Sequence, residues 1–565
     1  MDGEAAAVGI FRIDRHYKHF KRYRRIAEVF IRHGFGFAFD RIGLRHLIPV
    51  RRRVVRLERE LEPVNVGVRL RRAFEELGAT FVKLGQLLST RADLVPPEVL
   101  LELSRLQDDV APIPSEKAVA VIEEELGQPI GNVFAEFVVE PLAAASVAQV
   151  HRARLRTGEW VAVKVQRPGV REQIKTDLEI LERLAQLVKH RVRLELIDPV
   201  ELVDEFARQI WRELDFINEG GHIDRFQDHF KDDPTIKIPK VFWDYTTERM
   251  LVMEWIDGVK VLDAERMEQI GIDRKAVARR GAEAFLRQVL IHGYFHGDPH
   301  PGNVFILPGN RIAYIDFGVV GRLSEEAKNH LADLFLGIIR RDVERVIRGM
   351  TMLGAVDDQM DRRRLRTDVA DLVDRHYGKP LKEIKAAIVF NDALSLARRH
   401  RIRLPADLFL LGRALLTVEG MGERLDPDFN VVEIAEPFAR ELFRRRYDPR
   451  EVAKRAANDA GEYVEILARL PHRIDRLLDQ AERGRLTVRF RHEGLENLLN
   501  QLDLVSNRLA LAAVIASLVI GSSLVIQTNL GPFIAGYPAM GVIGYLTAFL
   551  LGVWLIWSIL RSGRF

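Results

Sequence analysis

Apolar residues recur at helical spacing through the early part of the chain. Between residues 66 and 91 they fall three or four positions apart, which predicts one amphipathic helix. The residues that form this stripe are Leu70, Phe74, Leu77, Phe81, Leu84 and Leu88. Pro96 and Pro97 end the pattern, and further helices are expected at residues 97–106 and 115–126, the latter with Ser115 as a candidate N-cap.

The pattern then becomes short and strand-like. Runs rich in Val, Ala and aromatic residues predict three antiparallel strands at residues 137–140, 147–155 and 160–166. Ala143, Ala144, Ala145 and Ser146 lie between the first two strands, where kinases carry a Gly-rich phosphate loop. Small side chains there would let backbone N–H groups approach phosphate oxygens, although a tight strand connection is the simpler reading.

The third predicted strand ends in Val-Ala-Val-Lys, with Lys164 after the apolar run. A buried lysine needs an anionic partner, so Lys164 is a candidate phosphate ligand. The alternative is an edge-strand lysine that reaches water. A helix predicted at residues 199–226 carries Glu213, Asp215 and Glu219, and either glutamate could pair with Lys164.

Further strands are expected at residues 240–245 and 249–255, and a helix at residues 274–292. Between the second of these strands and that helix, the segment from Glu254 to Gly258 is typical of a connector between two lobes. We expect an adenine to contact the backbone there, at Glu254 and Ile256. From Ser324 to about residue 507 the pattern is mostly helical, with one strand expected at residues 487–491.

The segment His296–Gly318 holds the polar groups of a phosphoryl-transfer site. Asp298 and Asn303 lie five positions apart, and Asp316 precedes Phe-Gly after an apolar run. Kinase-like folds place a base and two metal ligands in this order, so we expect Asp298 to orient or deprotonate the nucleophile and Asn303 and Asp316 to bind Mg²⁺. A polar turn is the alternative. His296 is expected to hold the loop rather than to transfer protons.

Composition adds limits rather than a function. The 565 residues are 47% apolar and 29% charged, and the absence of cysteine excludes disulfides and thiolate chemistry. A net charge of +4 is too small to imply a nucleic-acid partner. The first residues lack the pattern of a signal peptide, so we expect a cytoplasmic start. Basic clusters at residues 21–25 and 51–53 alternate with Phe and Ile, which suits either a membrane surface or a basic helix packed on its own domain.

The far end of the chain predicts a membrane anchor. No charged residue occurs from Leu509 to Leu560, which is long enough for two transmembrane helices, at about residues 509–527 and 540–560. A buried hairpin of a soluble domain is the alternative. The flanking charges are Arg508, Arg561 and Arg564, which favour both outer ends in the cytoplasm. The positions expected to pack the two helices closely are Gly541, Gly544, Ala548 and Gly552.

Four motifs together resemble the UbiB/ADCK family of atypical kinases, also called aarF-domain or ABC1 kinases. They are Lys83-Leu84-Gly85-Gln86, matching the family's KxGQ signature, the Ala143–Ser146 loop, Glu213-Leu214-Asp215, matching its ExD motif, and the C-terminal hairpin. The resemblance covers nearly the whole chain. It implies that Lys164 pairs with Glu219 and Lys83 with Glu213, which would lay Gln86 and its helix over the place where a peptide substrate would dock. Lys83, Gln86, Glu213 and Asp215 would then regulate the site, with Lys83 and Gln86 also close to the chemistry.

The resulting fold class is α+β, a bilobal protein-kinase-like fold. We expect a basic N-terminal region at residues 1–65, a helical KxGQ extension at residues 66–130, an N-lobe at residues 131–257, a helical C-lobe at residues 258–500 and the transmembrane pair at residues 508–560. Residues 319–323 leave no room for a long activation segment before the helix at Ser324, which disfavours a general protein kinase.

The resemblance implies a Mg²⁺- and ATP-dependent enzyme, with ATPase activity, that supports ubiquinone or related polyprenyl quinone synthesis on the cytoplasmic face of the membrane. Quinone-synthesis enzymes, polyprenyl intermediates and the membrane would be its partners, and a homodimer is compatible with it. A small-molecule or lipid phosphotransferase and a non-catalytic nucleotide-binding scaffold remain as alternatives. Neither a flavin fingerprint nor iron-ligand spacing supports a hydroxylase.

Overall fold

The computed structural model describes residues 20–36, 65–89, 91, 95–106, 110–191, 198–354, 360–375, 385–400, 402, 404–446, 495–528, 531–534 and 536–561. The chain divides into two compact units, Met1–Arg455 and Ala456–Phe565. The strand expected at residues 487–491 lies outside the described residues.

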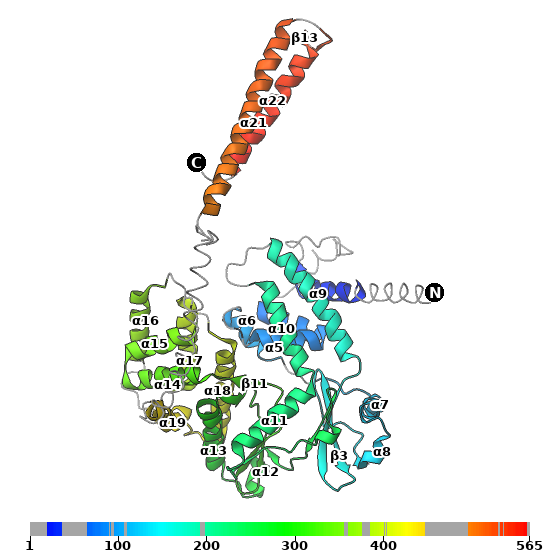
Figure 1. Ribbon diagram of the computed structural model, residues 1–565, viewed down its shortest axis with the longest axis vertical. Helices are drawn as coiled ribbons and strands as arrows, with labels where there is room; N and C mark the ends of the chain where they lie inside the picture. Colours follow the sequence, from blue (N-terminus) through cyan, green and yellow to red (C-terminus); the bar gives the residue numbers. More distant parts are fainter. Residues whose placement is uncertain are drawn as a thin grey trace, which may run out of the picture. The chain divides into compact units, whose positions relative to one another are not determined.

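A five-stranded antiparallel sheet forms the first lobe of the first unit (Figure 1). Its order is β1-β3-β4-β6, and β2 pairs with β3. The strands are β1 (Phe134–Phe137), β2 (Ala143–Ala144), β3 (Ala148–Leu155), β4 (Trp160–Gln166) and β6 (Met250–Glu254). The first strand therefore begins earlier than predicted, because the short helix α8 (Ile130–Val133) leads straight into it and Phe134 is buried. The strand expected at residues 240–245 is instead a single bridge at Val241 followed by a 3₁₀ turn, η2 (Trp243–Tyr245).

Strand β4 lies in the middle of this sheet and alternates between its two faces. Val161, Val163 and Val165 are fully buried in a cluster with residues of α7 (Ser115–Leu126). The helix α7 begins at Ser115 itself, with Pro114 at the N-cap position, so the predicted Ser115 cap is wrong. Ala162 faces the opposite cluster, and Lys164 shares that face because side chains two positions apart in a strand point the same way.

Three helices connect β4 to the rest of the first lobe: α9 (Val170–Arg191), α10 (Pro199–Glu213) and α11 (Phe216–Phe230). The single helix predicted at residues 199–226 is thus two helices. Asp215 separates them, because its side chain accepts a hydrogen bond from the Ile217 N–H at 3.1 Å and so caps the start of α11.

The N-terminal extension is also divided where one helix was predicted. Gly78, with φ of +92°, separates α4 (Val66–Leu77) from α5 (Ala79–Ser89), and α6 (Pro97–Leu103) follows. Ile26 and Val29, in a helix at residues 20–32, are buried in a cluster with Phe74 and Phe81. The described part of the basic N-terminal region therefore packs on its own domain, as one of the two readings expected. Residues 37–64 lie outside the described residues.

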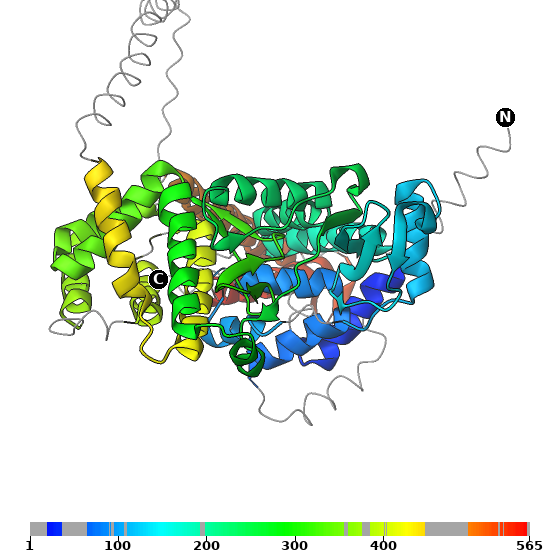
Figure 2. The ribbon, with the colours of Figure 1, turned by 90° about the horizontal axis from the view of Figure 1, so that it is seen from below.

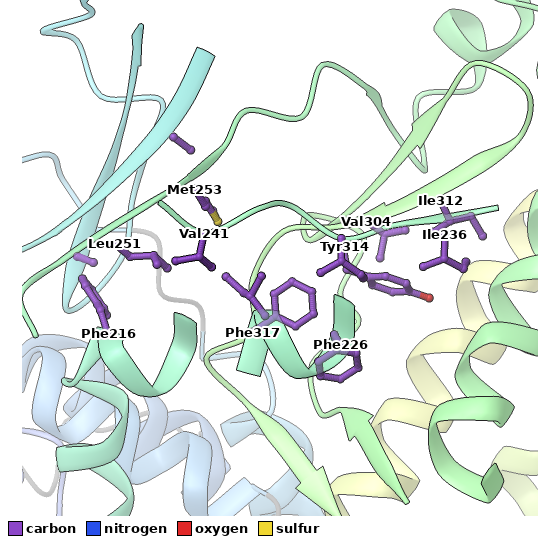
Figure 3. Close-up of a cluster of buried hydrophobic side chains, with 14 of the residues drawn as sticks. Phe216, Phe226, Ile236, Val241, Leu251, Met253, Val304, Ile312, Tyr314 and Phe317 are labelled. Atoms are coloured by element: carbon purple, nitrogen blue, oxygen red, sulfur yellow. The ribbon is translucent and has the colours of Figure 1, made fainter. Parts of the chain in front are cut away.

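A second sheet, β5-β10-β9-β7, and the strand pair β8-β11 form the start of the second lobe. Their strands are β5 (Ile236–Lys237), β7 (Val259–Lys260), β8 (Tyr294–His296), β9 (Val304–Leu307), β10 (Arg311–Tyr314) and β11 (Val320–Arg322). The core between the lobes is continuous: Phe216, Leu251 and Met253 of the first lobe and Val304, Ile312 and Phe317 of the second belong to one buried cluster (Figure 3).

Helices make up most of the remaining described residues of the first unit. α12 (Ala264–Gln269) and α13 (Arg274–Leu286) precede β8, and α13 continues as a π-helical turn, η3 (Arg287–His292). The helices after β11 are α14 (Glu325–Arg340), α15 (Val343–Leu353), α16 (Arg362–Arg375), α17 (Ala386–Arg399), α18 (Ala406–Leu425) and α19 (Val431–Arg446). Figure 2 shows these light green to yellow helices gathered at one end of the unit, away from the cyan strands.

The described part of the second unit is a hairpin of two long apolar helices, α21 (Leu495–Thr528) and α22 (Ala539–Arg561), joined through β12 (Phe533–Ile534) and β13 (Tyr537–Pro538). Both helices are long and apolar enough to cross a membrane. Gly541 and Gly544 lie against Ile526 and Ser522 with no room for a side chain, and Ala548 is buried. The expectation for Gly552 is wrong, since a Cβ atom there would meet nothing within 4 Å.

Candidate active site

Lys164 and Glu219 form a buried ion pair at the centre of the site. The Nζ atom of Lys164 donates to Oε1 and Oε2 of Glu219 at 2.8 and 2.9 Å. Lys164 is not an edge-strand residue, because β3 and β6 flank it, at Val150 and Leu251. Its side chain is 13% exposed and that of Glu219 is 5% exposed, so neither charge is solvated by bulk water. Of the two glutamates considered, Glu219 is the partner.

Asp316 approaches the same lysine from the second lobe. Its Oδ2 atom lies 3.7 Å from Lys164 Nζ, and its Oδ1 atom accepts a hydrogen bond from the Gly318 N–H at 2.9 Å. Although desolvation acts in the opposite direction, the charge of Lys164 and the Gly318 hydrogen bond hold the pKa of Asp316 below its usual range. The carboxylate is therefore ionised and ready to bind a cation.

The same cluster keeps Lys164 protonated. Burial disfavours its charge, but Asp316 and Glu219 outweigh burial and raise the pKa of Lys164 above its usual value. Lys164 therefore serves as a fixed cation, suited to phosphate oxygens, and not as a proton acceptor.

The loop after β8 orients Asp298 through its backbone. The Asp298 N–H donates to Nδ1 of His296 at 3.1 Å, and the Asp298 carbonyl accepts from Asn303 Nδ2 at 3.2 Å. His296 is 1% exposed, and burial lowers its pKa, so the ring is neutral and accepts at Nδ1. This arrangement agrees with a structural role for His296.

Asn303 is brought beside Asp316 by strand pairing. Tyr314 lies opposite Val304 in the β9–β10 pair, and the Ile315 N–H donates to the Asn303 carbonyl at 3.1 Å. An amide and a carboxylate oxygen are hard ligands that suit Mg²⁺, which binds one or two protein groups and completes its shell with water and phosphate. The described residues contain no group of three or more His, Cys, Asp or Glu side chains that could hold a metal, so a metal here would depend on such shared coordination.

Two residues of this site carry no signal in the motifs. His222, three positions after Glu219 on α11, lies with Nδ1 2.9 Å from the Phe317 carbonyl, and Phe317 packs on Phe226 with ring centroids 4.9 Å apart (Figure 3). The helix that holds Lys164 through Glu219 thus also holds the Asp316 loop. His222 lies three positions after Glu219 and so on the same face of the helix, and this spacing is the signal in the sequence that could have suggested it.

The second missed residue is Arg413 of α18. Its Nη2 atom lies 3.3 Å from Oδ1 of Asp298, which is 115 positions away in the sequence. No motif surrounds Arg413, so the sequence carries no signal that places it beside Asp298.

The KxGQ helix contributes a second ion pair. Lys83 of α5 pairs with Glu213 at the end of α10, as the family resemblance implies. The charge of Lys83 also helps to lower the pKa of Asp316, so this extension lies within electrostatic reach of the metal-binding candidate. The amide of Gln86 donates to the Leu106 carbonyl at 3.4 Å, a long hydrogen bond that ties α5 to the segment after α6.

The small-residue loop is more fixed than a glycine loop would be. Ala143 and Ala144 pair with Val150 and Gln149 in strand β2. The Ala145 N–H donates to the Ala148 carbonyl at 2.7 Å, and Ser146 is buried. The Ala145 N–H is therefore already occupied and does not point at a phosphate, which agrees with the tight strand connection given as the simpler reading of this loop.

The two residues predicted to contact an adenine in the connector between the lobes differ in their hydrogen bonding. The side chain of Glu254 pairs with Lys237 at 2.6 Å, and its backbone N–H donates to the Lys240 carbonyl at 2.8 Å. Ile256 is buried, and its main chain has no hydrogen-bond partner within the described part of the chain. Ile256 is thus the better candidate for adenine recognition.

These features define an atypical kinase-like protein. The chain matches the ABC1 atypical kinase-like domain over residues 105–350, the UbiB helical domain over residues 369–430 and the ABC1/UbiB kinase-like C-terminal domain over residues 493–561. It is 36% identical over 479 residues to the probable protein kinase UbiB of Marinobacter nauticus, covering 84% of this chain and 87% of that protein. The chain therefore belongs to the ABC1/UbiB family of atypical kinase-like proteins.

Other relatives extend the match. An uncharacterised protein encoded in the hydrogenase 1 5′ region of Clostridium pasteurianum is 34% identical over 547 residues, which is 96% of this chain and 99% of that protein. Among solved structures, the erythromycin complex of Rv3197 from Mycobacterium tuberculosis is similar, with 26% identity, a TM-score of 0.47, and coverage of 64% of this chain and 93% of that one.

Proposed function

We propose that this protein is a membrane-anchored atypical kinase-type enzyme that binds Mg-ATP and hydrolyses it in support of ubiquinone or related polyprenyl quinone synthesis. The observation that carries the nucleotide part is the cluster of Lys164, Glu219 and Asp316, in which a buried cation and an ionised carboxylate face each other across the two lobes. The quinone part rests on the family and on the UbiB name of relatives such as the Marinobacter protein.

Each group has a task in this proposal. Lys164 would neutralise the nucleotide phosphates, Asn303 and Asp316 would hold Mg²⁺, Ile256 would contact the adenine, and Asp298 would position the nucleophile. Bound Mg²⁺ would supply charge neutralisation at the phosphates. The residues themselves supply position and fixed charge, which is most of what phosphoryl transfer requires from a protein.

The acceptor is proposed to be water or a small lipid-like molecule. Strand β11 pairs with β8 directly after Gly318, and α14 begins at Glu325 with Ser324 as its N-cap. No free segment is left between them to dock a peptide, and the ion pair of Lys83 holds the KxGQ helix close to Asp316. Partner enzymes and polyprenyl intermediates belong to this proposal as the source of the acceptor.

The two apolar helices α21 and α22 are proposed as the anchor in the cytoplasmic membrane, with the kinase-like unit on the cytoplasmic side. Large apolar side chains such as Leu509, Phe549 and Trp554 are more than half exposed on this hairpin, which suits contact with lipid. The flanking arginines favour the same orientation.

A test of the nucleotide site is Asp316→Asn. Because the amide keeps the shape of the side chain but removes the charge that binds the metal, Mg²⁺ affinity is expected to fall by at least the roughly 10- to 100-fold that loss of an outer-shell partner costs. Mg-dependent nucleotide binding and ATP hydrolysis should fall with it, as measured by fluorescence titration and phosphate release.

Asp232→Asn, at an exposed aspartate after α11, is the matched control and should behave as wild type. Wild-type ATP binding and hydrolysis by Asp316→Asn would refute the proposed function. Labelled ATP with membrane extract separates the alternatives: transfer of label to lipid would favour a lipid phosphotransferase, and binding without any turnover would favour a scaffold.

A further inference from the structure

One face of helix α18 lies against the loop that carries Asp298. A Cβ atom added at Gly297 would lie 2.8 Å from Leu410 Cδ2, so the backbone of the loop touches this helix directly. One turn further on, Arg413 reaches the carboxylate of Asp298 at 3.3 Å. Leu410 and Arg413 are three positions apart and therefore share a helix face. The helix therefore contacts the backbone of the residue before the candidate base and the side chain of the base itself.

Among the described residues, Arg413 forms an ion pair with Asp298 and with no other carboxylate. Within the described part of the chain, Asp298 has one cationic partner, and it is Arg413. The two lysines nearest the metal-binding candidate already have carboxylates of their own, Lys164 with Glu219 and Lys83 with Glu213. Arg413 is thus not part of the group of ion pairs around the phosphate-binding candidate Lys164.

Stability does not explain this pair. The side chains of Arg413 and Asp298 are 34% and 36% exposed, and ion pairs with that much water contact contribute little to folding. Arg413 bonds to Oδ1 only, while Oδ2 of Asp298 has no hydrogen-bond partner among the described residues. One oxygen is held and the other is left to accept a hydrogen bond from a nucleophile.

We propose that Arg413 is a positioning residue, supplied by the helical region, which fixes the Asp298 carboxylate for phosphoryl transfer; this rests on the proposed function. In that reaction the nucleophile oxygen bonds to the γ-phosphorus, the bond from γ-phosphorus to the bridging oxygen breaks, and ADP leaves with the electron pair. The proton of the nucleophile passes to Oδ2 of Asp298 and then to solvent. Arg413 makes no contact with the reacting atoms and acts through the orientation of Asp298.

Arg413 belongs to a different part of the chain from the other candidate site residues. The residue lies in the segment matching the UbiB helical domain, outside the segment matching the kinase-like domain. The kinase-like domain thus has its metal and phosphate ligands within itself, but it takes the group that orients its candidate base from the helical domain. Any shift of α18 would change turnover before it changed nucleotide binding.

The test compares Arg413→Gln and Arg413→Lys in the full-length protein, with Mg-ATP affinity and the rate of phosphate release measured separately. Arg413→Gln should lower kcat roughly 10- to 100-fold, as expected for a misplaced catalytic group, and should leave nucleotide Kd unchanged. Arg413→Lys should recover part of the loss. Arg424→Gln, at an exposed arginine on the same helix, controls for loss of an arginine from α18 and should have wild-type kcat.

A double-mutant cycle separates positioning from other roles. In an Asp298→Asn background, Arg413→Gln should cause no further loss, because the group through which it acts is already neutral. The proposal is overturned if Arg413→Gln has wild-type kcat, if its loss appears in Kd instead, if the losses add in the double variant, or if wild-type protein binds Mg-ATP without turnover. Absence of Mg-dependent nucleotide binding by the wild type would refute the proposed function itself, and the role of Arg413 with it.

Discussion

Lys164 shows how one residue joins the strand pattern to the chemistry. Its neighbours Val163 and Val165 are fully buried on one face of β4, so the alternation of the strand directs the lysine to the other face, toward α11. An isolated cation in that position would be costly. Glu219 compensates it from the first lobe and Asp316 from the second, so the lysine joins the two lobes electrostatically.

Removal of this charge should change how the site responds to pH. The lowered pKa of Asp316 adds stability that is present above the usual aspartate value of about 4 and is lost as pH falls through the lowered value. Lys164→Met removes the main cause of the lowering, so Asp316 takes up its proton at a higher pH. We expect weaker Mg-nucleotide binding throughout, and an acid loss of the remaining binding that begins at higher pH than in the wild type.

Nucleotide titrations from pH 3 to pH 8 would measure this change. Lys189→Met removes a lysine from an exposed ion pair with Asp198 and serves as the control, with binding expected to follow the wild-type pH curve. Coincident acid limbs for Lys164→Met and wild type would contradict the electrostatic role assigned to Lys164.

At the scale of elements, the break between α10 and α11 decides which glutamate meets which lysine. Glu213 is the last residue of α10 and pairs with Lys83, whereas Glu219 lies in the first turn of α11 and pairs with Lys164. The apolar periodicity runs through the break, since Phe206, Ile210, Leu214 and Phe226 are all buried. Periodicity therefore predicted one helix, and only the N-cap chemistry of Asp215 marks the boundary.

This capping role can be separated from a direct role of the Asp215 charge. Asp215→Ala should destabilise the protein by about 1 kcal/mol and weaken Mg-nucleotide binding, because α11 loses its cap and Glu219 its fixed position. Asp215→Asn should retain most of both, since asparagine caps helices as well as aspartate does. Urea unfolding and nucleotide titration would measure the two effects.

Asp342, which caps α15 through the Arg345 N–H at 3.0 Å, provides the matched control. Asp342→Ala should lower stability by a similar amount without affecting nucleotide binding. If Asp215→Asn instead loses nucleotide binding as fully as Asp215→Ala, the charge of Asp215 has a function beyond the cap.

For the whole molecule, the sequence was sufficient for the kinase-like order of elements and for the polar residues between β8 and β11, because motifs and strand patterns are local. It could not supply the contacts that fix these parts together. Asp177 is fully buried, and its carboxylate accepts hydrogen bonds from the side chains of Arg22, 155 positions away, and Thr80, each at 2.6 Å. None of these residues belongs to a motif, yet they attach the KxGQ extension to α9. The role of Arg413 could not be predicted for the same reason, since an ion pair between distant parts of the chain leaves no periodic signal in the sequence.

The division of the chain leads to a prediction about its anchor. Every residue assigned to the nucleotide site lies in the unit Met1–Arg455, whereas the helices long and apolar enough to cross a membrane lie in the other. A chain ending at residue 455 should therefore bind Mg-nucleotide as the full chain does, but appear in the soluble fraction, while the full chain resists extraction from membranes by alkaline carbonate. Leu546→Arg in the full chain is the matched variant, since an arginine in the middle of a spanning helix costs about 3 kcal/mol on insertion. It should weaken membrane retention and leave nucleotide binding intact.

Retention of the shortened chain in membranes would instead assign the anchor to the basic N-terminal region, whose described helix at residues 20–32 is packed against α4 and α5.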